Sequence, residues 1–155
     1  MTIVASPQQI EMRVAAVEPA HSQHAENPLF AVILEEVGGT RRMPVVMRKP
    51  EADHIAMHLQ NMPTARPLTY SFMAGLLHAL GGSLIEARIT RTDGPTIYAA
   101  ATVSGCQGTK VVDARPSDVI NLALRVGAPI RVEAGVLDAM RATGRETGPA
   151  EIEWA

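Results

Sequence analysis

The segment KVVDARPSDVINLALRVGAPIRV, residues 110–132, decides the fold because it joins a strand, a sharp turn and a helix in one short stretch. A β-branched run ends at Asp113, and the proline that soon follows suits the first turn of a helix. Apolar residues then recur at helical spacing over 116–126, and Gly127 suits the position just after a helix. The segment therefore predicts a strand, a helix and a last short strand at 129–132.

Turn signals and apolar alternation extend this pattern to both sides of the segment. They predict strands near 10–16, 29–37, 40–47, 84–90, 97–103 and 108–114, and helices from Pro50, from Thr69 and over 135–143. Thr69 is expected to cap its helix, whose apolar stripe holds Phe72, Met73, Leu76, Leu77 and Leu80. The expected fold is α+β, with mixed or antiparallel sheets and packed helices, and the repeated hairpin-helix pattern described next favours it. One domain is expected over 1–145, with a frayed tail at 146–155.

One stretch of the first half resembles one of the second half. TRRMPVV followed by KPEADHIA resembles GTKVVDA followed by RPSDVINLA. Aligned in this way, Glu51 matches Asp118, and 55–56 matches 122–123, although the spacing from strand to acid differs by two residues. The similarity predicts an internal duplication of a hairpin-helix unit.

The charge balance excludes a protein that attracts nucleic acid through its overall field. The 155 residues carry 14 Lys and Arg against 16 Asp and Glu, a formal net charge of −2. Any such role needs a local basic patch, and Arg41, Arg42, Arg48 and Lys49 are the candidates. Only five aromatic side chains (two Phe, two Tyr and one Trp) are available to stack on bases.

Other features favour a soluble cytoplasmic protein with no membrane partner. No apolar run reaches the ~20 residues of a membrane span, and the first residues lack the pattern of a signal peptide. The single cysteine, Cys106, lies in a turn-like segment and is interpreted as a spectator. His54 and His58 share one helix face, but a solvated flank is favoured over a zinc site because the glutamate of the usual zinc motif is missing.

Three charged side chains crowd the turn between the strand and the helix of the opening segment. Asp113 and Asp118 can hold a divalent cation or activate a water, and Arg115 between them can bind a phosphate through two hydrogen bonds. Backbone N–H groups at the helix N-terminus would add to such a phosphodiester site. A structural interpretation is also open, in which Asp118 stabilises the helix dipole and Arg115 forms a buried pair with Asp113 or Glu51.

Several motifs, in a fixed order, carry a resemblance to a known family. They are MPVVM (43–47), EADHIAMHL (51–59), RPLT (66–69), IYAAATV (97–103) and VDARPSD (112–118) with the INLALRVGAPIRV that follows. On these motifs the chain resembles the bifunctional nuclease (DNase-RNase) family. The resemblance implies an α+β domain, usually dimeric, that hydrolyses both DNA and RNA.

The positions that match the family's motifs are Glu51, Arg66, Thr69, Asp113, Arg115, Ser117 and Asp118. We interpret Glu51, Asp113 and Asp118 as catalytic carboxylates, with Asp113 and Asp118 as candidate ligands of a divalent cation such as magnesium. The expected reaction is hydrolysis of phosphodiester bonds without strong sequence preference, assisted by that metal.

The remaining matched positions are interpreted as substrate-binding residues. Arg66 and Arg115 would grip the phosphate, together with Thr69 and Ser117. The site is expected to form one cleft, on which four side chains converge: Arg66, Asp113, Arg115 and Asp118.

The chain departs from the family's pattern at two places. After Arg-Pro-Leu the family usually reads Thr-His-Asp, whereas this chain reads Thr69-Tyr70-Ser71. Before Glu51 it has the charged stretch 47–50, Met-Arg-Lys-Pro, in place of Ile-Gly. If the missing histidine and carboxylate serve as general base and metal ligand, the chain binds without cleaving. The alternative function is therefore a non-catalytic dimeric regulatory or binding module on the same fold.

A homodimer is expected from the residues as well as from the resemblance. The strand at 40–47 carries a proline and reads as a sheet edge, with apolar residues at Met43, Val45 and Met47. An apolar edge needs cover, and a second copy of the chain would supply it.

Overall fold

The computed structural model describes residues 7–21 and 26–144, which form one sheet and four helices. The strands are β1 (Gln9–Ala20), β2 (Leu29–Glu36), β3 (Arg42–Arg48), β4 (Ser83–Asp93), β5 (Thr96–Gly105), β6 (Gly108–Ala114) and β7 (Ile130–Glu133). The helices are α1 (Lys49–Leu59), α2 (Thr69–Ala79), α3 (Pro116–Val126) and α4 (Ala134–Ala142). The α+β class predicted from the sequence is confirmed, whereas the predicted tail at 146–155 lies outside the described residues.

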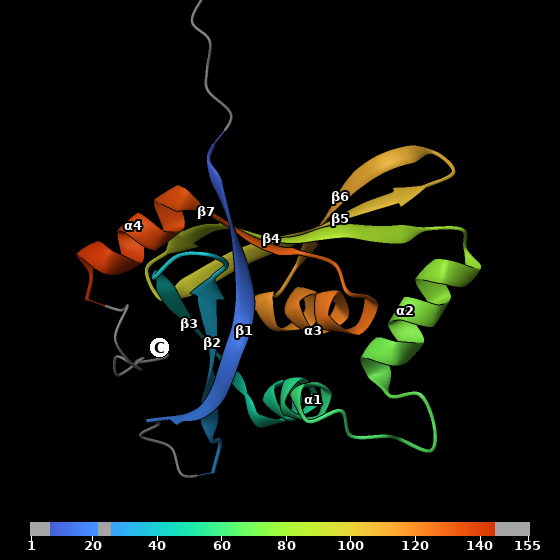
Figure 1. Ribbon diagram of the computed structural model, residues 1–155, viewed down its shortest axis with the longest axis horizontal. Helices are drawn as coiled ribbons and strands as arrows, with labels where there is room; N and C mark the ends of the chain where they lie inside the picture. The colour runs from blue at the N-terminus through green and yellow to red at the C-terminus, as the bar shows by residue number, and fades with distance from the viewer. Residues whose placement is uncertain (1–6, 22–25, 145–155) are drawn as a thin grey trace, which may run out of the picture.

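The strands of the described residues form a single sheet in the order β3-β2-β1-β7-β4-β5-β6. Neighbours are antiparallel except β4 and β7, which run parallel. β7 is therefore the central strand, and it joins two three-stranded units, β1–β3 and β4–β6. The sheet is strongly twisted, so that β1 runs across the direction of β4, and α3 lies in the angle between the two units (Figure 1).

The two units have the same topology, which confirms the duplication at that level. Each is an antiparallel meander whose third strand leads directly into a helix, α1 in the first unit and α3 in the second. β1 is antiparallel to β7 whereas β4 is parallel to it, so the units run in opposite directions, as a rotation of about half a turn requires. Arg48 and Arg115 occupy the two helix N-caps, and Glu51 and Asp118 each occupy the third position of their helix.

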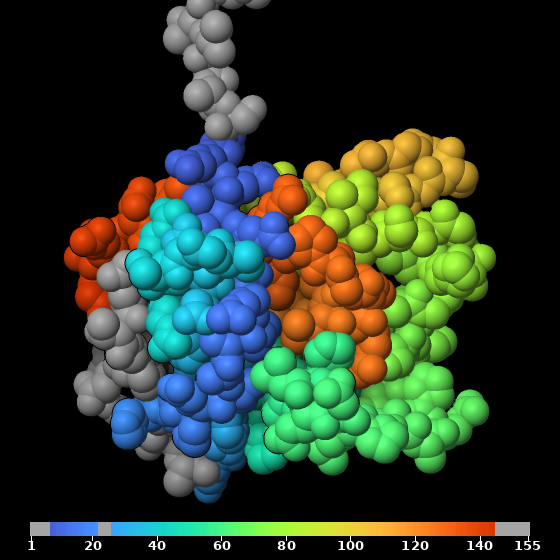
Figure 2. Space-filling model, viewed as in Figure 1, coloured from blue at the N-terminus to red at the C-terminus, as the bar shows by residue number. Residues whose placement is uncertain are grey.

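α3 is the buried centre of the fold. Its first residue is Pro116, which pre-sets the helical φ, and it ends at Gly127, whose φ of 72° lies in the left-handed region that glycine adopts at little cost. Ile120 is fully buried, and α3 packs against β4, β5, α1 and α2. The surfaces of α1 and α3 meet in the middle of the molecule, with α2 along one side (Figure 2).

α2 differs from the sequence prediction in two ways. Leu68, and not Thr69, is the N-cap residue, and no side chain caps the helix. Phe72, Leu76 and Leu80 of the predicted apolar stripe are exposed, and Tyr70 is the buried residue of this helix. The spacing of apolar residues identifies an apolar face but not the surface that covers it.

No helix within 7–21 and 26–144 is long and apolar enough to cross a membrane.

β3 is an edge strand, as predicted, but the reason given for covering it is wrong. Met43 and Val45 are fully buried, and Met47 is nearly so. All three pack in the core of the same chain. These three side chains therefore need no cover from a second copy.

Candidate functional site

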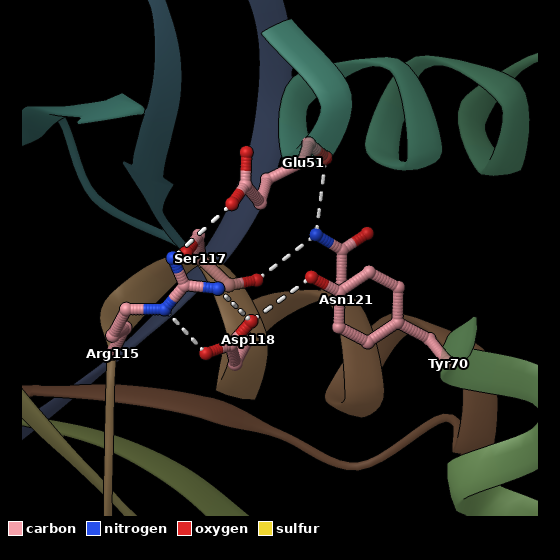
Figure 3. A network of polar contacts seen from close by, with 6 residues as sticks. All are labelled: Glu51, Tyr70, Arg115, Ser117, Asp118 and Asn121. Carbon is pink, nitrogen blue, oxygen red and sulfur yellow. Dashed lines mark hydrogen bonds and ion pairs between the residues drawn. The ribbon is translucent and has the colours of Figure 1, made fainter. Parts of the chain in front are cut away.

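Charged side chains from both duplicated units meet at the start of α3 (Figure 3). Arg115 donates two hydrogen bonds to Asp118, from Nε to Oδ2 at 2.7 Å and from Nη2 to Oδ1 at 2.8 Å. Its Nη1 donates to Oε1 of Glu51 at 3.2 Å. A single guanidinium thus bridges the third residue of α1 and the third residue of α3. We call Glu51, Arg115 and Asp118 the acid–arginine cluster.

The local sequence explains why both carboxylates reach this place. A proline in the first turn and an acid at the third position favour a helix N-terminus, where the partial positive charge of the backbone stabilises the carboxylate. Asn121 then fixes the two helices to each other. Its buried Nδ2 donates to the carbonyl oxygen of Glu51 at 3.1 Å and to that of Ser117 at 2.9 Å.

Tyr70 connects α2 to the cluster. Its hydroxyl donates to Oδ1 of Asp118 at 3.0 Å, and its ring lies edge-on to His54, with the centroids 5.1 Å apart. Burial raises the pKa of Tyr70 above its ordinary value, and the hydrogen bond to Asp118 raises it further. The hydroxyl of Tyr70 therefore holds Asp118 in one orientation.

The raised pKa of Tyr70 predicts how the phenol titrates. Because the folded pKa lies above the ordinary value of 10.0, the stabilisation from Tyr70 is fully present below about pH 10 and is lost at higher pH. In a Tyr98→Phe chain, which keeps Tyr70 as its single tyrosine, the tyrosinate absorbance at 295 nm should rise only as the fold is lost. A tyrosinate signal near pH 10 in a chain whose circular dichroism is still native would contradict this.

The cluster has an excess of negative charge. One guanidinium faces two carboxylates, so the formal charge is −1. Oε2 of Glu51 is buried and has no hydrogen-bond partner within the described ranges, although a buried carboxylate oxygen normally has one. The hydrogen bond to Asp118 raises the pKa of Arg115, so this guanidinium stays charged. The arrangement attracts a cation and repels a lone phosphate.

A divalent cation is the cofactor expected from the matched carboxylates, and the donor set fits magnesium. Magnesium keeps several of its waters and needs only one or two carboxylates from a protein. Glu51 and Asp118 would supply two. The unpartnered Oε2 of Glu51 is a free donor, whereas both oxygens of Asp118 already accept from Arg115 and Tyr70 and would be shared with the metal. The described parts of the chain hold no group of three or more His, Cys, Asp or Glu side chains, which a metal bound by protein ligands alone would need.

The structure brings together only some of the residues predicted from the sequence. Glu51 and Asp118 meet at Arg115, and Ser117 is buried beside them. Asp113 is exposed on β6, and Arg66 is exposed in the loop before α2. Neither side chain makes a hydrogen bond or ion pair with the described residues, so the structure does not join Asp113 or Arg66 to the cluster. Of the two partners that the structural interpretation offers for Arg115, the structure shows Glu51 and not Asp113.

Three residues beside the cluster are not predicted as site residues from the sequence. No role is assigned to Asn121 from the sequence, His54 is placed on a solvated helix flank, and Tyr70 is treated only as a departure from the family's pattern. Thr69, the remaining predicted contact, is exposed one residue before Tyr70. The duplication carried a usable signal, because His54 and Asn121 each lie three residues after the equivalent acids Glu51 and Asp118.

The basic patch predicted around the β2–β3 hairpin is largely neutralised. Ion pairs join Arg41 to Glu36 at 2.7 Å, Arg42 to Glu35 at 3.3 Å and Lys49 to Asp53 at 2.6 Å. The bonds from Arg41 lower the pKa of Glu36 to about 2, so this carboxylate stays charged at neutral pH. Three of the four basic groups are therefore matched by acids, and the patch is a weak candidate for phosphate binding.

These features define an α+β domain of two duplicated meander-helix units, with acids from both units around one arginine. The chain belongs to the family described as bifunctional nuclease domain, whose model matches residues 32–144. It is 38% identical over 127 residues to uncharacterized proteins of Mycobacterium tuberculosis strains CDC 1551 and H37Rv, covering 82% of this chain and 73% of each relative.

More distant relatives come from rice. The chain is 27% identical over 109 residues to Bifunctional nuclease 1 of Oryza sativa subsp. japonica and to Bifunctional nuclease of Oryza minuta. The match covers 68% of this chain but only 33% of each rice protein. The chain therefore corresponds to about a third of these relatives.

Proposed function

We propose that the chain hydrolyses phosphodiester bonds of DNA and RNA, without strong sequence preference, at the acid–arginine cluster. The observation that carries the proposal is the placement of two carboxylates, at equivalent helix N-termini, around one guanidinium. Membership of the bifunctional nuclease domain family and the names of the rice relatives support the same class of reaction. A cytoplasmic location is part of this proposal.

Each residue of the acid–arginine cluster would have its own role in hydrolysis. Glu51 and Asp118 would hold a divalent cation such as magnesium, which polarises a phosphoryl oxygen and acidifies water when bound. Arg115 has five N–H donors, and the contacts to Asp118 and Glu51 leave some of them for a phosphate oxygen. Its side chain is 64% exposed, so a substrate can reach it. Tyr70 would keep Asp118 oriented.

The other predicted residues keep supporting roles in the proposal. Arg66, exposed in the loop before α2, and Thr69, exposed at the first position of α2, would contact the nucleic acid beyond the cleaved bond. Asp113 remains a candidate carboxylate from β6, although the structure leaves it outside the cluster. Ser117 is buried, and its carbonyl oxygen accepts a bond from Asn121, which favours a part in positioning α3.

A non-catalytic dimeric regulatory or binding module on the same fold is the second candidate. It is favoured by Tyr70, which stands where the family usually has a histidine and whose hydroxyl is already bonded to Asp118. A tyrosine with a raised pKa is a poor base at neutral pH. Such a module would bind nucleic acid and leave it intact.

The test is a cleavage assay on end-labelled single-stranded DNA, duplex DNA and RNA, with magnesium or with EDTA. We expect shortened products with magnesium, none with EDTA, and none from a mock preparation of cells that lack the chain. A gel-shift series on the same substrates separates the two candidates. Binding without cleavage, in magnesium and in manganese, would contradict hydrolysis and support the module.

A further inference from the structure

α2 exposes an apolar surface that nothing else in the described chain covers. Phe72 is 64% exposed, Leu76 is 50% exposed and Leu80, just after the helix, is 73% exposed. Met73 adds to the same surface. α2 packs chiefly against α3, and it forms the outer edge of the molecule in Figures 1 and 2. A helix that is apolar on its outer side as well as its inner side is normally buried. We call these four residues the α2 face.

Gly75, within α2, indicates that another helix packs against this surface. Gly75 lies in the helix interior, where glycine is less stable than alanine. A Cβ at Gly75 would meet no atom within 4 Å, so packing within this chain does not require glycine there. Ala79 lies one turn further along the helix and is also exposed. Two small residues one turn apart allow the backbone of another helix to approach closely.

We propose that the α2 face binds the α2 face of a second copy of this chain, with the two helices crossing at Gly75. A two-fold interface brings each patch against an identical patch, so any charge on it would face a like charge. Residues 67–85 contain no Asp, Glu, Lys or Arg, and the face therefore meets its own copy without repulsion.

The size and composition of the face agree with this occupant. The exposed parts of its four residues amount to several hundred Å², which is at the upper end of the apolar patches that monomers leave in water. A standard interface removes about 800 Å² from each partner, so the face supplies about half of one. Nucleic acid and anionic lipid surfaces are recognised through Lys and Arg, which this stretch lacks.

The test is the mass of the full chain by light scattering at micromolar concentration. The wild type should have twice the 16.6 kDa of one chain, and Leu76→Glu should have the mass of one chain, because pairing would bury two carboxylates without partners. Val37→Glu is the matched control, since Val37 is 52% exposed on the β2–β3 turn, and it should remain a dimer. Circular dichroism checks that each variant is folded.

Gly75→Ala tests the crossing point. The added methyl group meets open space in one chain, so the helix should not be weakened, but it should raise the dimer dissociation constant by about tenfold or more by separating the backbones. Tighter association of Gly75→Ala would overturn the crossing. A folded Leu76→Glu dimer with wild-type affinity would overturn the interface.

If the dimer interface lies elsewhere, or if the α2 face binds something other than a second copy of the chain, the same measurements give different results. Val111→Glu, at an exposed position of the β6 edge, should leave the dimer intact, and its dissociation would place the interface on β6 instead. A wild-type monomer would overturn the proposal. If that monomer sedimented with vesicles of phosphatidylcholine and phosphatidylglycerol, and Leu76→Glu did not, the occupant would be a lipid surface.

Discussion

Asp118→Asn is expected to lower magnesium-dependent cleavage of nucleic acid by about 10²–10⁴-fold, because an uncharged amide neither holds the cation nor accepts a proton. The fold should survive the change. Asparagine keeps an oxygen that can accept from Tyr70 and Arg115, and the lost interaction with the helix dipole amounts to at most ~1 kcal/mol. Initial rates on single-stranded DNA, with the free energy of unfolding from urea titration, measure both effects.

Asp53→Asn is the matched control for this experiment. Asp53 is exposed on α1 and pairs only with Lys49 among the described residues, so its loss should change the rate less than twofold. Asp113→Asn tests the remaining predicted carboxylate in the same assay. Equal rates for Asp118→Asn and the wild type would remove the cluster from the mechanism, and a loss confined to Asp113→Asn would move the site to β6.

Ile120→Ala should cost about 2–5 kcal/mol of unfolding free energy, the range for removing a large side chain from a packed core. Ile120 is 0% exposed on α3, the helix that contacts both units of the sheet. The measurement is the urea midpoint at constant m-value. Val126→Ala, on the same helix but 42% exposed, should cost much less. A loss below about 1 kcal/mol for Ile120→Ala would show that the surroundings of α3 relax into the space.

Local signals predicted most of the fold. Residues 108–114 and 116–126 form β6 and α3 with the predicted bounds, because a proline and a glycine mark the ends of the helix. The sequence similarity between the two halves predicted that Glu51 and Asp118 are equivalent. In the structure both residues occupy the third position of a helix. These features depend on neighbours in the sequence, which pattern and backbone chemistry describe well.

The rest of the site depends on contacts that spacing does not encode. The structural interpretation offers Asp113 or Glu51 as the partner of Arg115, and sequence spacing does not choose between them. Asp113 lies on β6, whereas Arg115 is the N-cap residue of α3. The partner of Arg115 from the first unit is Glu51, 64 positions away. The outward α2 face is a similar case. Its helical spacing was read correctly, but the surface that covers it depends on tertiary packing.

The position of β7 determines when this domain can assemble during its synthesis. The two meander units consist of contacts between strands that are close in sequence, and such contacts form early. The units cannot become one sheet until residues 130–133 leave the ribosome, because β7 pairs with β1 through Ile10 and Val132 and with β4 through Ala87 and Ile130. A chain that terminates before residue 130 would carry two unpaired inner strand edges, which promote aggregation. Premature termination would therefore leave two separate three-stranded sheets that tend to aggregate. The native sheet can form only after β7 has been synthesised.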